Sequence, residues 1–428
     1  MASFCYLVVV RSTRFCYDGG MLIDMSPLKT YPQYRKVFFG QLVSFFGSQI
    51  TYVALPWQLY QLTNSTFQVG LLGLAQLIPL LGVGLIGGAI ADRFERRWIC
   101  FYSELLLALC NVVLVVLTVS RQITPGWIYV IGALMAGLNS LHRPAFSALV
   151  PQLVKREDMA RVSPLNSFPT TFGMIAGPAV GGLLLATVGI KWTYVIDGLT
   201  YVFAMAMMLW LPKIDVPGKG IARVNFVAVK EGLKYALSRR DLLGTYLVDM
   251  LAMSFAFPNP LFPLLAAQIA GADKIGWYYS SIAIGAMLAT LTSGWTLNRI
   301  RHGKMITLAA AGWGIGIFFF GLTSQSFLPS LCFLIFAGWS DMVSGIFRGT
   351  VWNQTIPADR RGRLASVEML SYASGPLIGN SFMGFMADAW GASTALMVGG
   401  TLAATSCMML GRALPPFWRY EAKHGTVV

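Results

Sequence analysis

The stretch Gly88–Arg97 reads GAIADRFERR and follows the apolar run 67–90. A similar pattern occurs 206 positions later, where Gly294–Arg299 reads GWTLNR after another apolar run. Arg143 and Arg348, near the ends of two further apolar runs, are 205 positions apart. Features that recur at nearly one offset indicate an internal repeat, so we predict that the chain consists of two homologous halves.

The composition indicates what the halves are made of. The chain has 428 residues, of which 56% are hydrophobic. This is about 240 apolar side chains and, at ~20 per span, enough for about twelve membrane-spanning helices. Charged residues make up 12% of the chain, against ~25% in soluble proteins. This composition excludes a disordered chain, a coiled coil and almost any soluble domain.

Twelve apolar segments are bounded by charged residues, prolines or polar clusters. They cover residues 37–62, 67–90, 99–119, 126–149, 163–188, 191–211, 242–268, 276–298, 305–325, 328–350, 364–387 and 391–411. Most connections are short, so consecutive helices run antiparallel. We therefore predict an all-α integral membrane protein with twelve transmembrane helices in two pseudo-symmetric six-helix bundles, related by an axis along the membrane normal.

The longer loop 212–241 separates the two sets of six segments. The expected units are an N-terminal tail (1–36), a first bundle (37–211), a linker (212–241), a second bundle (242–411) and a C-terminal tail (412–428). Within the linker, Val227–Leu237 is basic and helical in pattern, which predicts a helix on the membrane surface. Residues 1–36 do not fit a signal peptide. We interpret them as a disordered tail or as the product of an upstream start codon, with Met21 or Met25 as the true start.

The basic residues predict the orientation. The chain has 32 basic and 18 acidic residues and a net charge of +14, which in a soluble protein would suggest a nucleic-acid partner. With the N-terminus inside, 27 basic residues fall on the inner side, and only Arg121, Lys191 and Lys274 fall outside. The positive-inside rule then predicts a multi-pass protein of the plasma (inner) membrane with both termini in the cytoplasm. Nucleic acid is not expected as a partner.

Two motifs resemble those of the major facilitator superfamily. Gly88–Arg97 resembles its signature between the second and third helices, although Glu95 stands where a glycine is usual. The fifth segment contains GMIAGPAVGG at Gly173–Gly182, and the eleventh contains the similar stretch GPLIGN at Gly375–Asn380. This pair is similar to the antiporter motif of drug and proton exchangers.

Three further stretches resemble the enterobactin-type siderophore exporters, a subfamily whose relatives also include drug and macrolide exporters. They are Leu28–Pro32 followed by Arg35, Val37 and Phe38; Ser65–Leu71; and Asp341 and Arg348 together with Arg361–Arg363.

The resemblance implies a gating role for the loop after the second helix, through Gly88, Asp92, Arg93, Arg96 and Arg97. Asp92 is expected to pair with a helix end or a basic side chain of the other half when the cavity faces outward. Such a latch biases an equilibrium between two states. The alternative is a solvated loop whose arginines only orient the chain.

In the fifth helix, Gly173, Gly177 and Gly181 recur every four residues and form one stripe beside Pro178 and Gly182. Such a stripe permits close helix packing and a kink. The resemblance implies that this contact seals the bundle against proton leak, and packing alone is the alternative.

Carboxylates within the spans are the candidate functional groups, because a charge in the bilayer costs about 2.5 to 3.5 kcal/mol. Asp249 lies in the seventh helix and Asp341 in the tenth, and both helices line the central cavity in the superfamily. Arg348 is about two turns below Asp341 and is its candidate partner. Together with Arg143 they are candidates for proton coupling or substrate contact. For the two aspartates, a structural hydrogen-bond network is equally open.

Other acidic residues are expected near the membrane interfaces in structural roles. They are Glu104, which we expect to pair with Arg96 or Arg97, together with Asp197 and Glu368.

The first helix is polar. Gln41, Ser44, Ser48 and Thr51 share one face at helical spacing, and Gln49 is a further candidate. A polar stripe in lipid must turn toward another helix or a wet cavity. It predicts substrate contact or interhelical hydrogen bonds.

The seventh helix contains three prolines within Phe257–Pro263. They predict a broken helix near the outer mouth, serving as a gate, or alternatively an aromatic belt at the interface.

The predicted function is secondary active transport that exports a small amphiphilic molecule by alternating access, coupled to the proton gradient. An enterobactin-type siderophore is the expected substrate, and multidrug or macrolide efflux is the alternative. The two cavity carboxylates, Asp249 and Asp341, favour a cationic substrate, whereas binding of an anionic siderophore would require exposed Arg or Lys in the cavity.

The rival class is a polytopic membrane enzyme or a receptor. The sequence has no nucleotide-binding loop, no H-E-x-x-H pattern and only three histidines, and its six cysteines lack metal-ligand spacing. We therefore expect neither an enzyme nor a metal or cofactor. The expected partners are the bilayer, a small-molecule substrate and protons, and the protein is expected to be monomeric.

Overall fold

A computed structural model describes residues 24–212, 234–235, 237–269, 271–356 and 361–421. Within these ranges the chain is helical. The long helices of the first half are α2 (Pro32–Thr63), α3 (Thr66–Arg93), α4 (Arg96–Val119), α5 (Pro125–Leu153), α6 (Met159–Thr187) and α7 (Ile190–Leu209). Those of the second half are α9 (Arg240–Ala256), continued by η2 (Asn259–Leu261) and α10 (Phe262–Gln268), then α11 (Ala272–Leu291) with η3 (Ser293–Asn298), α12 (His302–Leu322), α13 (Phe327–Thr355), α14 (Arg361–Trp390) and α15 (Ala392–Ala413). Short helices are α1 (Ser26–Thr30), η1 (Arg156–Asp158) and α16 (Pro415–Trp418).

Local sequence signals explain where several helices begin. Pro32 and Pro125 occupy the first positions of α2 and α5. Proline is favourable there because the N–H that it lacks would make no hydrogen bond within the helix. Ser65 caps α3, and its hydroxyl accepts a hydrogen bond from the N–H of Gln68 at 3.2 Å. The hydroxyl thus satisfies one of the free donors at the helix start.

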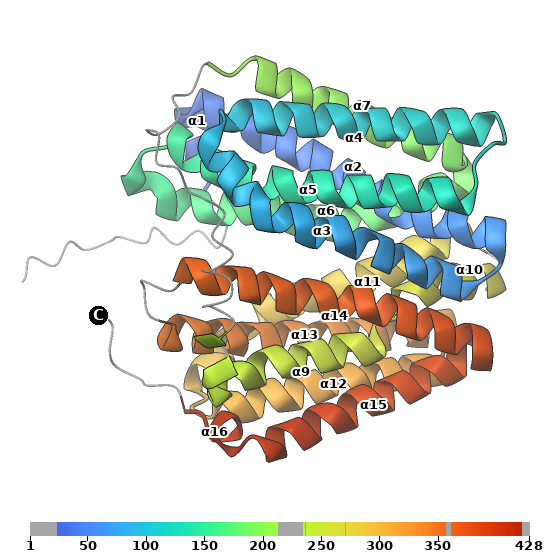
Figure 1. Cartoon of the computed structure of the whole chain (residues 1–428), viewed down its shortest axis with the longest axis vertical. Coiled ribbons are helices and arrows are strands. Elements are labelled where there is room, and N and C mark those ends of the chain that lie inside the picture. Colours follow the sequence, from blue (N-terminus) through green and yellow to red (C-terminus); the bar gives the residue numbers. More distant parts are fainter. Residues whose placement is uncertain (1–23, 213–233, 236, 270, 357–360, 422–428) are drawn as a thin grey trace, which may run out of the picture.

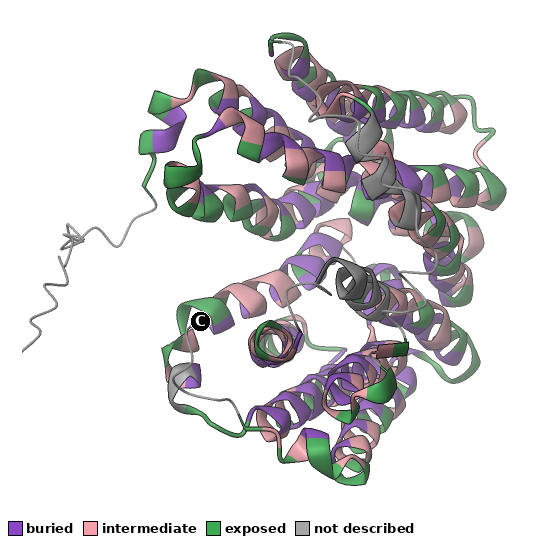
Figure 2. Cartoon of the chain, turned by 60° about the vertical axis from the view of Figure 1, so that its left-hand side comes forward, coloured by how far each residue is buried: buried purple, intermediate pink, exposed green. Residues whose placement is uncertain are grey.

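The predicted fold class is confirmed, because each of the twelve predicted segments corresponds to a long helix or, for the seventh, to a broken one. Within the described residues, nine helical spans are long and apolar enough to cross a membrane. Figure 2 shows buried residues gathered inside each half and exposed residues on the outward sides of the helices. The exposed residues include many large apolar ones, such as Ile78, Leu199 and Leu328. This distribution suits a protein surrounded by lipid.

The seventh helix is broken where the prolines predict a break. Helix α9 ends at Ala256, and the chain resumes as η2 and α10. The indole Nε1 of Trp313 donates to the free carbonyl of Ala256 at 3.1 Å. The break therefore keeps this polar backbone group satisfied inside the protein, as a membrane interior requires.

The two halves lie one above the other in Figure 1 and meet through two helix pairs, α3 with α14 and α6 with α11. Each pair joins the second long helix of one half to the fifth of the other. An exchange of the halves maps one pair onto the other, as expected for two related bundles.

Both ends of the described chain lie at the same end of the bundles, which we call the terminal face; the opposite end is the far face (Figure 1). At the terminal face, α1 packs through Leu28 and α16 through Phe417, both buried. The predicted surface helix Val227–Leu237 falls mostly outside the described residues.

The halves are held together toward the far face. Asp388 of α14 accepts hydrogen bonds from Ser65 Oγ at 2.5 Å and from Thr66 N and Oγ1 at 2.7 and 2.6 Å. The amide of Asn259 donates to the hydroxyl of Tyr52 at 2.9 Å. The hydrogen bonds that join described side chains across the halves, including those of Ser280 and Ser381, lie in the half of the molecule nearer the far face.

Glycine residues also allow the two halves to pack closely near the far face. A Cβ built on Gly276 of α11 would clash with the Pro178 carbonyl oxygen of α6, and one on Gly182 would lie 2.7 Å from the Gly276 nitrogen. Side chains at these positions would separate the halves.

We expect Asp388→Asn to loosen the far face, because the amide cannot accept all three hydrogen bonds. A loss of about 1 kcal/mol changes the ratio of closed to open forms about fivefold. A cysteine placed at Val69, which lines the small pocket between the halves near this face, should then react several-fold faster with an impermeant maleimide. The matched control is Asp273→Asn, also near the far face; equal labelling in both variants would contradict the role of Asp388.

Candidate functional site

Three charged side chains meet in the second half. Asp249 lies on α9, and Asp341 and Arg348 lie two turns apart on α13. Arg348 Nη1 forms an ion pair with Asp249 Oδ1, and its Nη2 lies 3.7 Å from Asp341 Oδ1. The structure thus brings together three of the predicted site residues.

The three side chains differ in exposure. Those of Asp249 and Arg348 are 6% and 10% exposed, whereas that of Asp341 is 37% exposed. With both carboxylates ionised, the cluster carries one net negative charge. Because Asp341 is the member within reach of water, it is the carboxylate best placed to exchange a proton.

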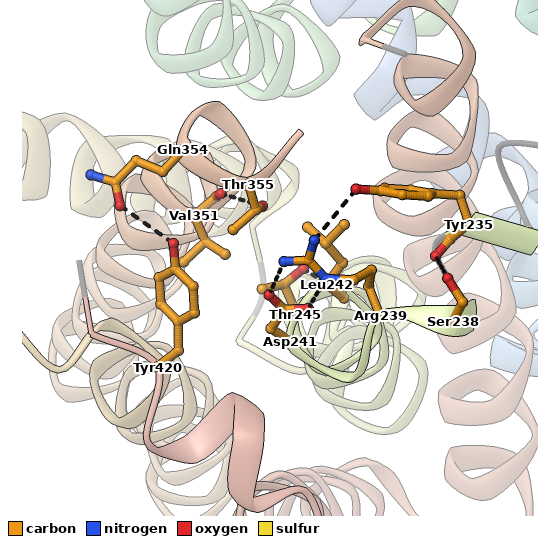
Figure 3. Close-up of polar contacts among 10 residues, drawn as sticks. All are labelled: Tyr235, Ser238, Arg239, Asp241, Leu242, Thr245, Val351, Gln354, Thr355 and Tyr420. Atoms are coloured by element: carbon orange, nitrogen blue, oxygen red, sulfur yellow. Dashed lines mark hydrogen bonds and ion pairs between the residues drawn. The ribbon is translucent and has the colours of Figure 1, made fainter. Parts of the chain in front are cut away.

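Contacts at the terminal face tie down the ends of the two helices that carry this cluster (Figure 3). At the start of α9, Arg239 Nη2 lies 2.6 Å from Asp241 Oδ2, and Arg239 Nη1 donates to the Tyr235 hydroxyl at 3.4 Å. The Asp241 carboxylate raises the pKa of Arg239. Near the end of α13, the Tyr420 hydroxyl donates to Gln354 Oε1 at 3.4 Å.

Arg143 of α5, the counterpart of Arg348 in the repeat, is exposed and forms no hydrogen bond or ion pair with any described residue. Its neighbour His142 is buried, with Nε2 3.2 Å from Glu104 Oε1. The two halves therefore use their corresponding arginines differently.

The predicted pairing of Glu104 with Arg96 or Arg97 is wrong. Glu104 is buried and accepts hydrogen bonds from Ser44 Oγ at 2.9 Å. Arg96 donates to the Ala148 carbonyl, and Arg97 contacts Glu95 at 3.3 Å. Glu104 lies eight residues beyond Arg96, about 12 Å along the helix, too deep to reach it. The sequence did hold a signal for the observed contact: His142 stands inside an apolar run, where a polar side chain needs a partner.

Two polar side chains of the first helix serve its packing. Ser44 binds Glu104 of α4, and Thr51 donates to Asp197 of α7 at 2.5 Å. Asn111 of α4 donates to the same Asp197 carboxylate at 2.8 Å. Asp197 is fully buried, so it lies in a hydrogen-bonded core and not at an interface.

The other candidates on this helix make different contacts. The Oε1 atom of Gln41 is buried without a hydrogen-bond partner. Ser48 donates to the carbonyl of Phe45 in its own helix at 2.8 Å. Gln49 packs against Gly177 of α6, where an added Cβ would lie 2.5 Å from Gln49 Cβ.

The glycine stripe of α6 lies against α2. A Cβ on Gly173 would lie 2.5 Å from the ring of Phe45, and one on Gly181 would lie 3.2 Å from the Cα of Ile50. Pro178 and Gly182 instead face α11 of the other half. One short motif therefore packs both within its half and across the two halves.

Gly88, Asp92, Arg93 and Glu368 lie outside the part of the chain whose side chains the structure describes. Among the described side chains, no group of three His, Cys, Asp or Glu residues is placed to hold a metal ion.

Two six-helix bundles, with a buried charged cluster in the second, have the architecture of a transporter of the major facilitator type. Solved structures agree on the fold. The chain is similar to the nucleoside transporter NupG (TM-score 0.68, 14% identity, 91% of this chain and 99% of that one). It is also similar to the xylose transporter XylE from E. coli in its inward open conformation (TM-score 0.67, 13% identity, 93% and 98%).

The chain belongs to the transmembrane secretion effector family, whose model matches residues 23–424. Curated relatives include the enterobactin exporter EntS of Salmonella typhimurium (strain LT2), 27% identical over 372 residues, covering 85% of this chain and 87% of the relative. Another is the EntS of Escherichia coli O1:K1, 29% identical over 371 residues with the same coverage. These relatives and structures are transporters and not enzymes.

We expect Arg348→Gln to destabilise the protein, because it leaves Asp249 buried and unpaired. Removing one partner of a buried pair costs about 3 to 5 kcal/mol, so the Tm of the purified protein should fall clearly. The double variant Arg348→Gln/Asp249→Asn should recover much of that loss. Arg301→Gln, which removes an exposed pair with Glu421, is the control; an equal loss of Tm in both single variants would argue against a buried charge.

Proposed function

We propose that this protein exports an amphiphilic siderophore of the enterobactin type and that the proton gradient drives the export. The family, the fold and the EntS relatives make it a membrane transporter of a small molecule. Substrate and coupling are the parts proposed here. The cluster of Asp249, Asp341 and Arg348 is the observation that carries the coupling.

A proton at Asp341 changes the charge of this cluster. When Asp341 is ionised, two carboxylates share one guanidinium, and the excess negative charge is costly at membrane depth. When Asp341 binds a proton, Arg348 and Asp249 form a neutral pair. Proton binding thus alters the preference between conformations, which is what coupling requires.

We further propose that the terminal face is cytoplasmic, which the excess of Lys and Arg there supports. The contacts described between the halves lie toward the far face, so the structure is consistent with a cavity open to the cytoplasm and ready to load substrate. The linker 212–241 and both tails would then be cytoplasmic. The gating role of Asp92 and its neighbours and the sealing role of the α6 glycines stay part of this proposal.

The protein is proposed to act as a monomer in the bilayer, exchanging substrate for protons and without nucleic acid. Macrolide or multidrug efflux is the second candidate. The net negative charge of the Asp249, Asp341 and Arg348 cluster favours it, because such a site attracts a cation.

Flux into inside-out vesicles of purified protein separates these functions. An outwardly directed transporter of the proposed kind takes up enterobactin when the vesicle interior is made acidic. Uptake of erythromycin without enterobactin would support the drug-efflux function, and gradient-independent uptake of enterobactin would contradict proton coupling.

We expect Asp341→Asn to abolish the stimulation of enterobactin uptake by the gradient, because the amide cannot exchange a proton. Exchange of labelled for unlabelled enterobactin should continue at equal pH. Asp273→Asn, a carboxylate in the first turn of α11, serves as the matched control. Full stimulation in Asp341→Asn vesicles would remove this residue from the coupling mechanism.

A further inference from the structure

Arg143 is a charged group that the proposed coupling does not use. It lies ten residues before the end of α5 at Leu153, about 15 Å along the helix, which is membrane depth. Its side chain is exposed and has no partner among the described residues. An arginine at this depth ordinarily faces a wet cavity or pairs with another group.

The lipid-facing side of α5 is marked by Trp127, Val130 and Leu134, which are exposed and spaced by three and four residues. Arg143 follows Leu134 by nine residues, or two and a half helical turns. It therefore points to the opposite side of the helix, away from lipid. The buried contact of His142 with Glu104 holds α5 in this rotation.

Helix α6 indicates that the space between the halves is open toward the terminal face. Pro178 and Gly182 pack on α11 in its far half. Thr171 precedes them by seven and eleven residues, and Ser167 precedes Pro178 by eleven, so all four share one stripe. Ser167 and Thr171 are nevertheless exposed, as is Ser147 one turn beyond Arg143.

We propose that Arg143 binds an anionic oxygen group of the substrate, a catecholate or a carboxylate, assisted by neighbouring hydroxyls such as Ser147. The inference rests on the proposed export function and deepens it by naming the recognised group. A guanidinium presents a planar fork of donors that matches two adjacent oxygens. Arg348 cannot take this role, because Asp249 and Asp341 already engage it.

The two walls of the cavity then orient an amphiphile. The negative cluster of the second half repels the anionic end, and Arg143 of the first half binds it. Electrostatic complementarity of this kind selects substrates by charge.

The test measures KM for enterobactin and for its catechol-methylated neutral analogue in vesicles with Arg143→Gln, Arg143→Lys and the control Arg156→Gln. We expect Arg143→Gln to raise the KM for enterobactin at least tenfold and to leave that for the neutral analogue within twofold. Arg143→Lys should recover part of the affinity, since it keeps the charge without the fork. Arg156 is exposed at the terminal face, and its variant should match wild type.

An unchanged KM for enterobactin in Arg143→Gln, or an equal rise for both compounds, would overturn the inference while leaving the export function standing. Wild-type vesicles that transport no enterobactin would overturn both. Loss of all uptake in Arg143→Gln together with normal selectivity in Arg143→Lys would support the charge requirement, and loss of all uptake in both variants would count against it.

Discussion

A charged side chain at membrane depth must be paired, or must face water, because lipid offers no compensation for its lost hydration. This constraint explains the interior of the protein. Asp249 and Arg348 pair, Asp341 stays partly wet beside them, and Glu104 lies against His142. Arg143 has no partner among the described residues and is turned from the lipid. The charged side chains of the helices therefore either hold two helices together or are candidates to line the transport path.

The same requirement governs how the halves meet. Polar contacts near the far face are made between groups that satisfy each other, such as Asp388 with the start of α3. Backbone approaches at Gly276 and Gly182 fill the remaining space. Both sets lie where the helix pairs α3 with α14 and α6 with α11 join the halves. Apolar packing joins the halves as well, because one cluster of buried residues has members in both, such as Leu72 and Met383.

Much of the fold could be predicted from the sequence, because the cost of burying polar backbone in lipid forces long apolar runs to be helices. The contact of Arg348 with Asp341 was also within reach, since two turns of one helix bring them together. Its stronger contact with Asp249 joins two separate helices, and no local pattern contains it. The sequence could thus suggest which residues form the candidate cluster, but only part of the geometry that joins them.

Local reasoning failed where a nearer partner competed with a distant one. Glu104 follows two arginines in the chain, yet it lies so deep in α4 that it contacts His142 and Ser44 instead. The closure by Asp388 and Ser65 joins residues 323 positions apart. The position of Ser65 before α3 predicts that it caps this helix. Nothing in the sequence predicts that Asp388, a carboxylate of the other half, also binds the start of the helix.

The broken seventh helix has a kinetic consequence. An unbroken helix must give up main-chain hydrogen bonds before it can bend. In this one the chain is already divided at Phe257 and Pro258, and the indole of Trp313 donates to the buried carbonyl of Ala256. We therefore expect that α10 can move relative to α9 without the loss of a helical turn. On this proposal, the barrier to opening the far face comes mainly from the repacking of the buried side chains of α10, such as Phe262 and Leu265.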